Sequence, residues 1–376
     1  MTSLNGKLLD LDPGTVRLVG PASGADPDRS ADRSPELAAD RSPELAADHS
    51  DQDCEPEGPP TFPEGWELAP GYRVKNHINR GQALDVYEVF SDERLCSCIA
   101  KVVRPDRREV RRVVDRLQHE GQTLLRLGHP HLVRCWEVLE EPQPTLILQT
   151  IPGTTLEEAI EDRLRRYTVE DLAHLGRHLC SALHYLHAEG VLHLDIRPAN
   201  IMAEGGIVKL IDLSLARAPG PARGGRGTRH YMAPEQAAGG IMSAATDVWG
   251  IGATMYEAAT GEPPFAPLDE AEDEIYGAQH GYLQLLRPAP PLRYWRRRLP
   301  RTLRAAIESC LQPDPEARPG VDELYATLGT VLDDVAARQA AREAALEAAS
   351  EEASAAEFRS SSNVVGQQVG AGSSRR

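Results

Sequence analysis

The stretch HLDIRPAN, residues 193–200, places Asp195 and Asn200 five positions apart behind a histidine. Carboxylate and amide oxygens suit a hard cation that keeps some of its water, such as Mg²⁺. Phosphoryl transfer requires metal ions of this kind, a positioned nucleotide and a carboxylate near the attacking hydroxyl group. The stretch is therefore a candidate phosphoryl-transfer loop. Its unusual feature is Leu194, which separates His193 from Asp195.

A lysine and a glutamate earlier in the chain could bind the phosphates. Lys101 lies in the strand-like run CSCIAKVV, where its ammonium group can meet phosphate oxygens if a carboxylate keeps the side chain extended. Glu120, on the helix-like segment that follows, is the candidate partner. Either residue alone is more typical of a surface charge. The string E-x-x-x-L-x-x-L-x-H-P, from Glu120 to Pro130, favours a site.

The segments around these residues predict two structural parts. Strand-like alternation in YRVKNHIN, DVYEVF and CSCIAKVV is followed by a helical pattern and then by two more strand-like runs, LVRCWEVLE and TLILQTI. This order indicates an antiparallel sheet with one helix packed on it. After PGTT at 152–155 the pattern becomes mainly helical. Helices are expected over 169–190, 244–260, 301–311 and 321–334.

Seven motifs occur in the order seen in the eukaryotic-like protein kinase family. They are IAK, Glu120, HLDIRPAN, DLS at 212–214, APE at 233–235, DVWGIG at 247–252 and PEARP at 315–319. The chain resembles a bacterial serine/threonine protein kinase, and its Ala-, Arg- and Pro-rich composition is similar to that of actinobacterial members. The resemblance implies an α+β, bilobal fold over about 70–332. A small antiparallel-sheet N-lobe with one helix (70–151) would precede a larger, mainly helical C-lobe (152–332).

The resemblance also implies how ATP and Mg²⁺ would be bound. Lys101 would hold the α- and β-phosphates of ATP, and Glu120 would hold Lys101. Asn200 and Asp212 would ligate the two Mg²⁺ ions that bridge the phosphates. The family pattern places further nucleotide contacts at Asn79, Gly81, Val86, Ala100, Leu148, Gln149 and Ile151.

The remaining implied roles concern the acceptor, a Ser or Thr hydroxyl of a protein substrate. Asp195 would accept or orient the hydroxyl proton, and Thr228 would brace Asp195. Arg197 occupies a position where lysine is usual and would neutralise the transferring phosphate. His193 is expected to be a packed, hydrogen-bonded residue of the scaffold.

The sequence departs from the family pattern in two regions. The pattern G-x-G-x-x-G falls on residues 79–84, where only Gly81 survives, and this weakens the expectation of tight phosphate binding. Leu194 replaces an arginine that grips a phosphate in many kinases. The segment RAPGPARGGRG at 217–227 contains no Ser, Thr or Tyr. The receptor and the site for an activating phosphate are absent together, which favours activity without phosphorylation of this segment.

Composition excludes several other classes of function. The 41 Lys and Arg against 57 Asp and Glu give a formal charge of −16, which argues against a nucleic-acid partner. The sequence contains no run of about 18 apolar residues, so no membrane span is predicted. The absence of a secretion signal and the six scattered cysteines indicate a cytoplasmic protein with reduced thiols.

The two ends of the chain differ from its middle. Residues 1–65 are acidic, contain ADRSPELA at 31–38 and again at 39–46, and are predicted to be disordered. Residues 333–376 are predicted to be a helical extension followed by a disordered tail.

Two alternatives to an active protein kinase stay open. A pseudokinase that serves as a scaffold or a nucleotide-binding interaction module would share the fold, but such proteins generally lack one of the five residues Lys101, Glu120, Asp195, Asn200 and Asp212. A small-molecule kinase of related fold is disfavoured by GTRHYMAPE at 227–235, which is similar to the peptide-substrate platform of protein kinases.

Overall fold

The computed structural model describes residues 58–162, 167–204, 206–268, 272, 274 and 281–370. The predictions for residues 1–57, which include both copies of ADRSPELA, and for 371–376 lie outside the described residues. None of the helices in the described part of the chain combines the length and the apolar character that a membrane span requires.

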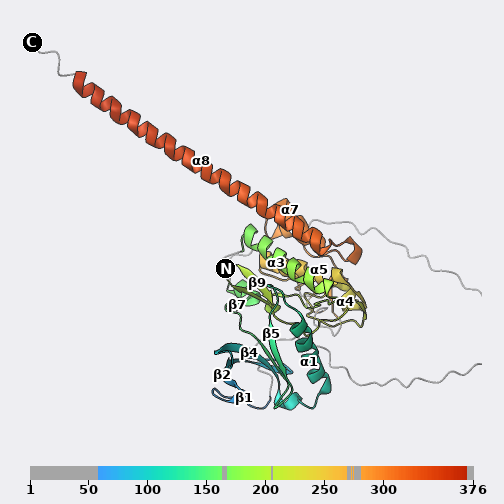
Figure 1. Ribbon diagram of the computed structural model, residues 1–376. Helices are drawn as coiled ribbons and strands as arrows, with labels where there is room; N and C mark the ends of the chain where they lie inside the picture. The colour runs from blue at the N-terminus through green and yellow to red at the C-terminus, as the bar shows by residue number, and fades with distance from the viewer. Residues whose placement is uncertain are drawn as a thin grey trace, which may run out of the picture. The chain divides into compact units, whose positions relative to one another are not determined.

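The first lobe is a six-stranded antiparallel sheet with one helix (Figure 1). The strands lie in the order β1-β2-β3-β4-β6-β5, and helix α1 follows β4 in the chain after a short 3₁₀ turn, η1. The predicted three strands, helix and two strands are confirmed, with β1 as an additional edge strand. The bounds are β1 (Glu67–Ala69), β2 (Tyr72–Arg80), β3 (Leu84–Ser91), β4 (Cys96–Val103), η1 (Pro105–Arg107), α1 (Arg111–Arg126), β5 (Cys135–Leu139) and β6 (Thr145–Gln149).

The second lobe is mainly helical, as predicted (Figure 1). Helix α5 is buried along almost its whole length and forms the centre of this lobe, because its sequence is apolar on all sides. Helix α3 begins at a capping box between Thr168 and Asp171 and buries one apolar face. The helices are α2 (Leu156–Glu161), α3 (Val169–Ala188), α4 (Pro234–Ala238), α5 (Ala244–Thr260), α7 (Arg301–Cys310) and α8 (Val321–Gly370).

Short strands and 3₁₀ turns complete the second lobe. Three strands form one small sheet in the order β7-β8-β9, and β10 pairs with β11 in a two-stranded ladder. The strands are β7 (Thr154–Thr155), β8 (Ile201–Glu204), β9 (Ile207–Leu210), β10 (Gly220–Ala222) and β11 (Gly240–Met242). The 3₁₀ turns are η2 (Pro198–Asn200), η3 (Leu283–Leu285), η4 (Leu292–Tyr294) and η5 (Pro315–Ala317).

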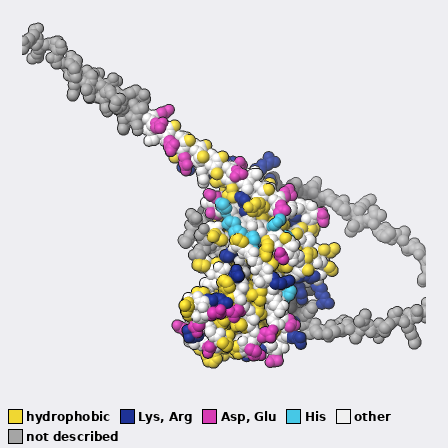
Figure 2. Space-filling view, viewed as in Figure 1, with side chains coloured by type: hydrophobic (Ala, Val, Ile, Leu, Met, Phe, Trp, Pro, Cys, Tyr) yellow, Lys and Arg dark blue, Asp and Glu magenta, His cyan; other side chains and the backbone are white. Residues whose placement is uncertain are grey.

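Aromatic and histidine rings connect the loop after α1 to α3. The ring of His131 stacks on that of His178 with centroids 4.2 Å apart, and His129 stacks on Tyr185 at 5.3 Å. Figure 2 shows histidine side chains gathered near α3. The backbone also bridges the lobes, since the amide of Val133 donates to the carbonyl of Leu210 (2.8 Å). These contacts fix α1 and the sheet relative to the helical lobe.

At both ends of the domain the structure contains more ordered residues than the sequence predicts. Residues 58–65 belong to the folded unit, so their assignment to the disordered tail is wrong: the ring of Phe62 lies 5.9 Å from Trp66 and 5.8 Å from Tyr87. Helix α8 runs to Gly370 and so covers most of residues 333–376, for which a helical extension and a disordered tail were predicted. Its Ala- and Glu-rich sequence favours propagation of a helix once the packed first turns have nucleated it.

Candidate functional site

Lys101 lies at the junction of the two lobes and contacts both predicted partners. Its Nζ is 2.8 Å from Glu120 Oε1 and 2.9 Å from Asp212 Oδ2. Strand β4 supplies the lysine, α1 the glutamate, and the segment after β9 the aspartate. The Glu120 side chain is fully buried and also accepts a hydrogen bond from the amide of Leu213 at 3.5 Å. The three charged residues therefore form one connected cluster.

Charge and burial together set the protonation of this cluster. Burial alone would lower the pKa of Lys101, but the carboxylates of Asp212 and Glu120 outweigh it and hold that pKa above its ordinary value. Burial raises the pKa of Glu120, which the lysine opposes only in part. Burial would also raise the pKa of Asp212, but Lys101 and Ser214 hold it well below its usual range. Lys101 and Asp212 are therefore both charged at neutral pH, as phosphate and cation binding require.

The loop that carries Asp195 is held by the central helix α5. The buried Asp247 carboxylate accepts hydrogen bonds from the amides of His193 (2.9 Å) and Leu194 (2.7 Å). These bonds hold Leu194 at φ +64°, a left-handed conformation that costs a leucine about 1–2 kcal/mol. Gly250 permits the close approach of α5, because an added Cβ would lie 2.7 Å from Cβ of Ile196. The loop is thus fixed by its scaffold rather than by its own sequence preference.

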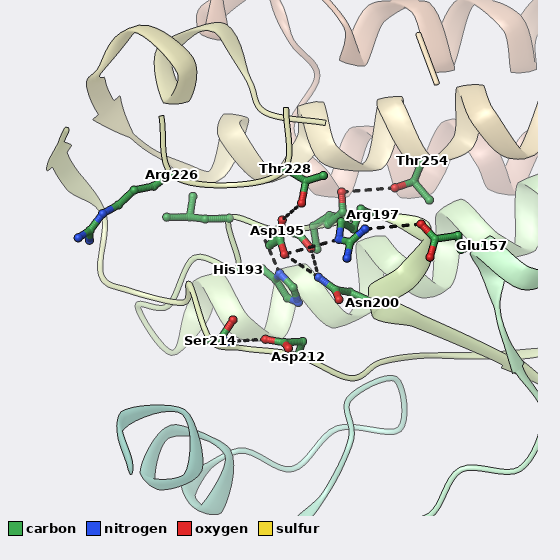
Figure 3. A network of polar contacts seen from close by, with 12 residues as sticks. Glu157, His193, Asp195, Arg197, Asn200, Asp212, Ser214, Arg226, Thr228 and Thr254 are labelled. Carbon is green, nitrogen blue, oxygen red and sulfur yellow. Dashed lines mark hydrogen bonds and ion pairs between the residues drawn. The ribbon is translucent and has the colours of Figure 1, made fainter. Parts of the chain in front are cut away.

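Asp195 is oriented by two neighbours (Figure 3). Its Oδ2 accepts a hydrogen bond from Asn200 Nδ2 at 2.8 Å, and its Oδ1 accepts one from Thr228 Oγ1 at 3.2 Å. Arg197 Nε lies 3.8 Å from Asp195 Oδ2, and Arg197 Nη1 lies 3.6 Å from Glu157 Oε1. The predicted residues Asp195, Asn200, Thr228 and Arg197 are therefore adjacent, and Glu157 is a neighbour that sequence reasoning did not identify.

His193 has the structural role that the sequence predicts. Its side chain is completely buried, burial lowers its pKa, and its Nδ1 accepts a hydrogen bond from the Asp195 amide at 3.3 Å. Glu235 and Arg318 form an ion pair with two parallel contacts of 2.8 Å in the same lobe. We assign His193 and this ion pair a role in supporting the lobe.

The oxygen atoms available beside Asp195 fit Mg²⁺. The side-chain nitrogen of Asn200 donates to Asp195, so the Oδ1 atom of Asn200 is available to a cation. Asp212 contributes an ionised carboxylate. A hydrogen bond from the Ile211 amide to the Asn200 carbonyl (3.0 Å) keeps the segments of these two candidate ligands close together. Within the described ranges no group of three or more His, Cys, Asp or Glu side chains is placed to hold a metal. Two protein oxygens suit Mg²⁺, which keeps several waters and binds phosphate oxygens.

Cross-strand pairing shows which apolar residues share the face of Lys101. Val86 on β3 lies directly opposite Lys101, and Ile99 on β4 lies opposite Leu148 on β6. Directly opposed residues in an antiparallel pair point to the same face, as do residues two apart on one strand. Val86, Ile99 and Leu148 are therefore the apolar candidates for the nucleotide side of the sheet.

The prediction that Ala100 contacts the nucleotide is wrong. It is fully buried on the opposite face of the sheet, in a cluster with Tyr72, Tyr87 and Ile147. The reason is the two-residue period of a strand, which sends neighbours to opposite faces. Ile99 takes the position expected of Ala100, and the same alternation rule applied to Lys101 identifies it from the sequence.

The other predicted nucleotide residues lie along the edge of the same region. Asn79 pairs with Val86 at the end of β2, and Gly81 begins the turn between β2 and β3. Gln149 ends β6, and Ile151 follows it in the connection to the second lobe. Their contact with a nucleotide stays a prediction.

Comparisons with known proteins agree with this geometry. Residues 72–328 match the family model described as protein kinase domain. The serine/threonine-protein kinase PkaA of Streptomyces coelicolor is 33% identical over 233 residues, which is 59% of this chain and 41% of the relative. PknB of Mycolicibacterium smegmatis, also a serine/threonine-protein kinase, is 32% identical over 215 residues, 53% of this chain and 34% of the relative. The serine/threonine-protein kinase RUNKEL of Arabidopsis thaliana is 30% identical over 260 residues, 66% and 17% of the two chains.

The chain spans less than half the length of these curated relatives. The family match covers most of the chain and includes every residue of the Lys101 cluster and of the Asp195 loop. The chain therefore belongs to the protein kinase domain family.

Proposed function

We propose that the chain is an ATP- and Mg²⁺-dependent protein kinase that transfers the γ-phosphate to Ser or Thr hydroxyls of protein substrates. The observation that carries this proposal is the position of Lys101, which contacts Glu120 at 2.8 Å and Asp212 at 2.9 Å at once. A lysine held by both lobes is set to bind phosphate oxygens beside a metal-binding carboxylate. All five residues required for transfer are present in one connected site.

Each residue then has a physical task in the transfer. Asp195, oriented by Asn200 and Thr228, accepts a hydrogen bond from the substrate hydroxyl and receives its proton. The guanidinium of Arg197 lies beside it and neutralises charge on the transferring group. When bound by Asn200 and Asp212, Mg²⁺ supplies positive charge against the phosphate oxygens.

The acceptor class follows from the segment after Gly227. Thr228, Tyr231 and Met232 of this segment line a small cavity beside Asp195 together with Asp247 and Gly250 of α5. We infer that the segment carries the substrate peptide, because GTRHYMAPE is similar to the peptide-substrate platform of protein kinases. Relatives named serine/threonine-protein kinases support Ser and Thr as acceptors. We place the activity in the cytoplasm, because the five described cysteines are free thiols at scattered positions.

A scaffold without catalytic activity is the second candidate function. It would retain the fold and the ion pairs but would transfer no phosphate. Purified protein incubated with γ-labelled ATP, Mg²⁺ and a generic protein substrate separates the two, when compared with the Asp195→Asn variant. Transfer by the wild type alone supports the kinase, and equal signals support the scaffold.

The activity that we propose does not need phosphate on the activation segment, residues 212–235. Leu194, at the position where many kinases carry a phosphate-binding arginine, is 8% exposed and packs with Leu192 and Met242. Leu215 and Ala222 of the activation segment pack against the same cluster. Apolar contact therefore replaces the Arg–phosphate pair as the link between the segment and the Asp195 loop.

Backbone pairing gives the activation segment a second support. Strand β10 pairs with β11 over Gly220–Ala222. The amide of Arg217 donates to the carbonyl of Leu192 (3.1 Å), and the amide of Leu192 donates to the carbonyl of Arg217 (2.8 Å). Gln236 Nε2 donates to the carbonyls of Leu194 (2.7 Å) and Arg226 (2.6 Å). The segment is thus ordered by contacts present in the unmodified chain.

Replacing Leu194 with Arg tests this support. The substitution should lower stability by about 2 kcal/mol and reduce phosphate transfer severalfold, because a charge would replace a buried apolar side chain. Thermal unfolding and initial rates measure the two effects. Leu95→Arg is the matched control, since Leu95 also has positive φ (+51°) but is 77% exposed. Higher activity of Leu194→Arg after phosphorylation of the segment would contradict the apolar link.

A further inference from the structure

Residues 58–66, which we call the N-terminal strap, precede the part of the chain that matches the family model yet pack against its sheet. The amide of Phe62 donates to the hydroxyl of Tyr87 at 3.1 Å, and the Phe62 ring lies between Trp66 and Tyr87. Tyr87 is fully buried on β3, four residues after the turn that follows β2. The strap is therefore packed in a defined position on β3, near that turn.

A buried arginine connects the strap to the strands on both sides of the turn. Arg80, the last residue of β2, forms a two-point pair with Asp85 of β3 at 2.9 and 3.1 Å. Both side chains are nearly buried, with 7% and 2% exposed. Arg80 Nη2 also donates to the carbonyl of Pro59 in the strap at 2.8 Å. One guanidinium thus joins the strap to the base of the turn.

A second buried arginine holds the turn from its other side. Arg104, 1% exposed, donates from Nη1 to the carbonyl of Gly81 at 3.1 Å, and its amide donates to the carbonyl of Ala83 at 3.0 Å. Asp106 fixes the guanidinium with two contacts of 3.0 and 3.1 Å. The guanidinium lies so close to Gly58 of the strap that a side chain at that position would collide with it. Strap, arginine and turn are therefore in mutual contact.

The turn itself is the place where the sequence lacks two of the three glycines of the family pattern. Its remaining glycine, Gly81, closes the hairpin by donating its amide to the carbonyl of Leu84 at 2.8 Å. A loop rich in glycine is flexible and loses much entropy when a ligand orders it. A turn that is already held in one conformation avoids most of that loss.

We propose that the N-terminal strap, Arg80 and Arg104 form a clamp that holds the turn at 81–83 in its nucleotide-binding conformation. The clamp takes over the positioning that a flexible glycine loop achieves only on binding, and it makes the segment before the family domain part of the nucleotide site. This inference rests on the proposed function for the identity of the ligand, ATP. The contacts that define the clamp are present without any ligand.

Variants of the whole 376-residue chain test the clamp. Tyr87→Phe removes the hydroxyl that binds the Phe62 amide and also bonds to Asp85, and Phe62→Ala removes the ring. Arg73→Ala is the control, since its pair with Asp92 is half-exposed on the same sheet. Hydrogen exchange of the peptide covering 78–86 should become several times faster in both clamp variants without nucleotide. The KM for ATP should rise about fivefold, the effect of one lost hydrogen bond, with kcat at saturating ATP unchanged.

Each arm of the experiment has a decisive outcome. Exchange at wild-type rates in a folded Tyr87→Phe protein would overturn the clamp, whether or not the chain proves to be a kinase. Faster exchange combined with an unchanged or lower KM for ATP would overturn its role in preorganising the nucleotide site. A wild type that binds no ATP would contradict the proposed function, and the exchange data alone would then decide whether the strap holds the turn.

Discussion

Replacement of Asp195 by Asn should reduce the rate of phosphate transfer by about 10³-fold, within the range for loss of a general base. The variant keeps the shape of the side chain, so the contacts with Asn200 and Thr228 can largely persist. It loses the negative charge that attracts the hydroxyl proton. The defect should therefore appear in kcat, while the affinity for Mg²⁺-ATP stays within about twofold of the wild-type value.

Single-turnover transfer from γ-labelled ATP measures this effect, and nucleotide titration measures affinity. Asp92→Asn is the matched control, because Asp92 is 45% exposed and pairs with the surface residue Arg73 in the first lobe. The control should transfer phosphate at the wild-type rate. Equal rates for wild type and Asp195→Asn would remove Asp195 from the mechanism and favour the scaffold function.

Replacement of Lys101 by Met should impair both transfer and stability. It removes the ammonium group that would hold the phosphates, at an expected cost of about 10²-fold in rate. It also leaves the buried carboxylate of Glu120 and that of Asp212 without their shared partner. Breaking a buried ion pair by removing one member costs about 3 kcal/mol or more. The variant should therefore unfold at clearly lower denaturant concentration at neutral pH.

The pH dependence of stability distinguishes this cause from a simple loss of packing. In the wild type the raised pKa of Lys101 gives stability that is full below about pH 10 and is lost as pH rises beyond it. The lowered pKa of Asp212 gives stability that is present above about pH 4 and is lost as pH falls. These two groups therefore leave wild-type stability level between about pH 5 and 9.

In Lys101→Met the pH dependence should become steeper, because the pKa of Glu120 is already raised by burial in the wild type and would rise further without the lysine. The folded state then binds a proton that the unfolded state does not, so the free energy of unfolding should increase as pH falls from 8 to 5. Denaturant unfolding at several pH values measures this slope. A variant with the same pH profile as the wild type would contradict the proposed electrostatic role of Lys101.

The sequence alone was sufficient to predict which charged and polar residues meet in the site, because each lies within a recognisable motif. Lys101, Glu120, Asp195, Asn200 and Asp212 come from distant segments, and the ordered motifs around them predicted their convergence in one site. The strand and helix order was predictable for a related reason, since apolar periodicity in the sheet and in α3 and α5 is strong. The motif order also identified the two-lobe architecture.

Other features depend on contacts that no local pattern contains. The role of Leu194 depends on Asp247, which holds the backbone, and on Met242, which packs against the side chain. Arg197 has a neighbour, Glu157, whose position is set by a helix cap forty residues earlier in the chain rather than by any motif near the loop. The strap was assigned to a disordered tail because its composition resembles the preceding residues, whereas Phe62 has a partner in Tyr87.

We propose that this site transfers phosphate with an unmodified activation segment. The direct test is the initial rate of transfer by the whole 376-residue chain treated with a phosphatase, with mass spectrometry used to establish that residues 212–235 carry no phosphate at the start. We expect the treated wild type to be as active as the untreated protein and about 10³-fold more active than Asp195→Asn. A treated wild type no more active than Asp195→Asn, or one whose activity returns only with phosphate on this segment, would contradict it.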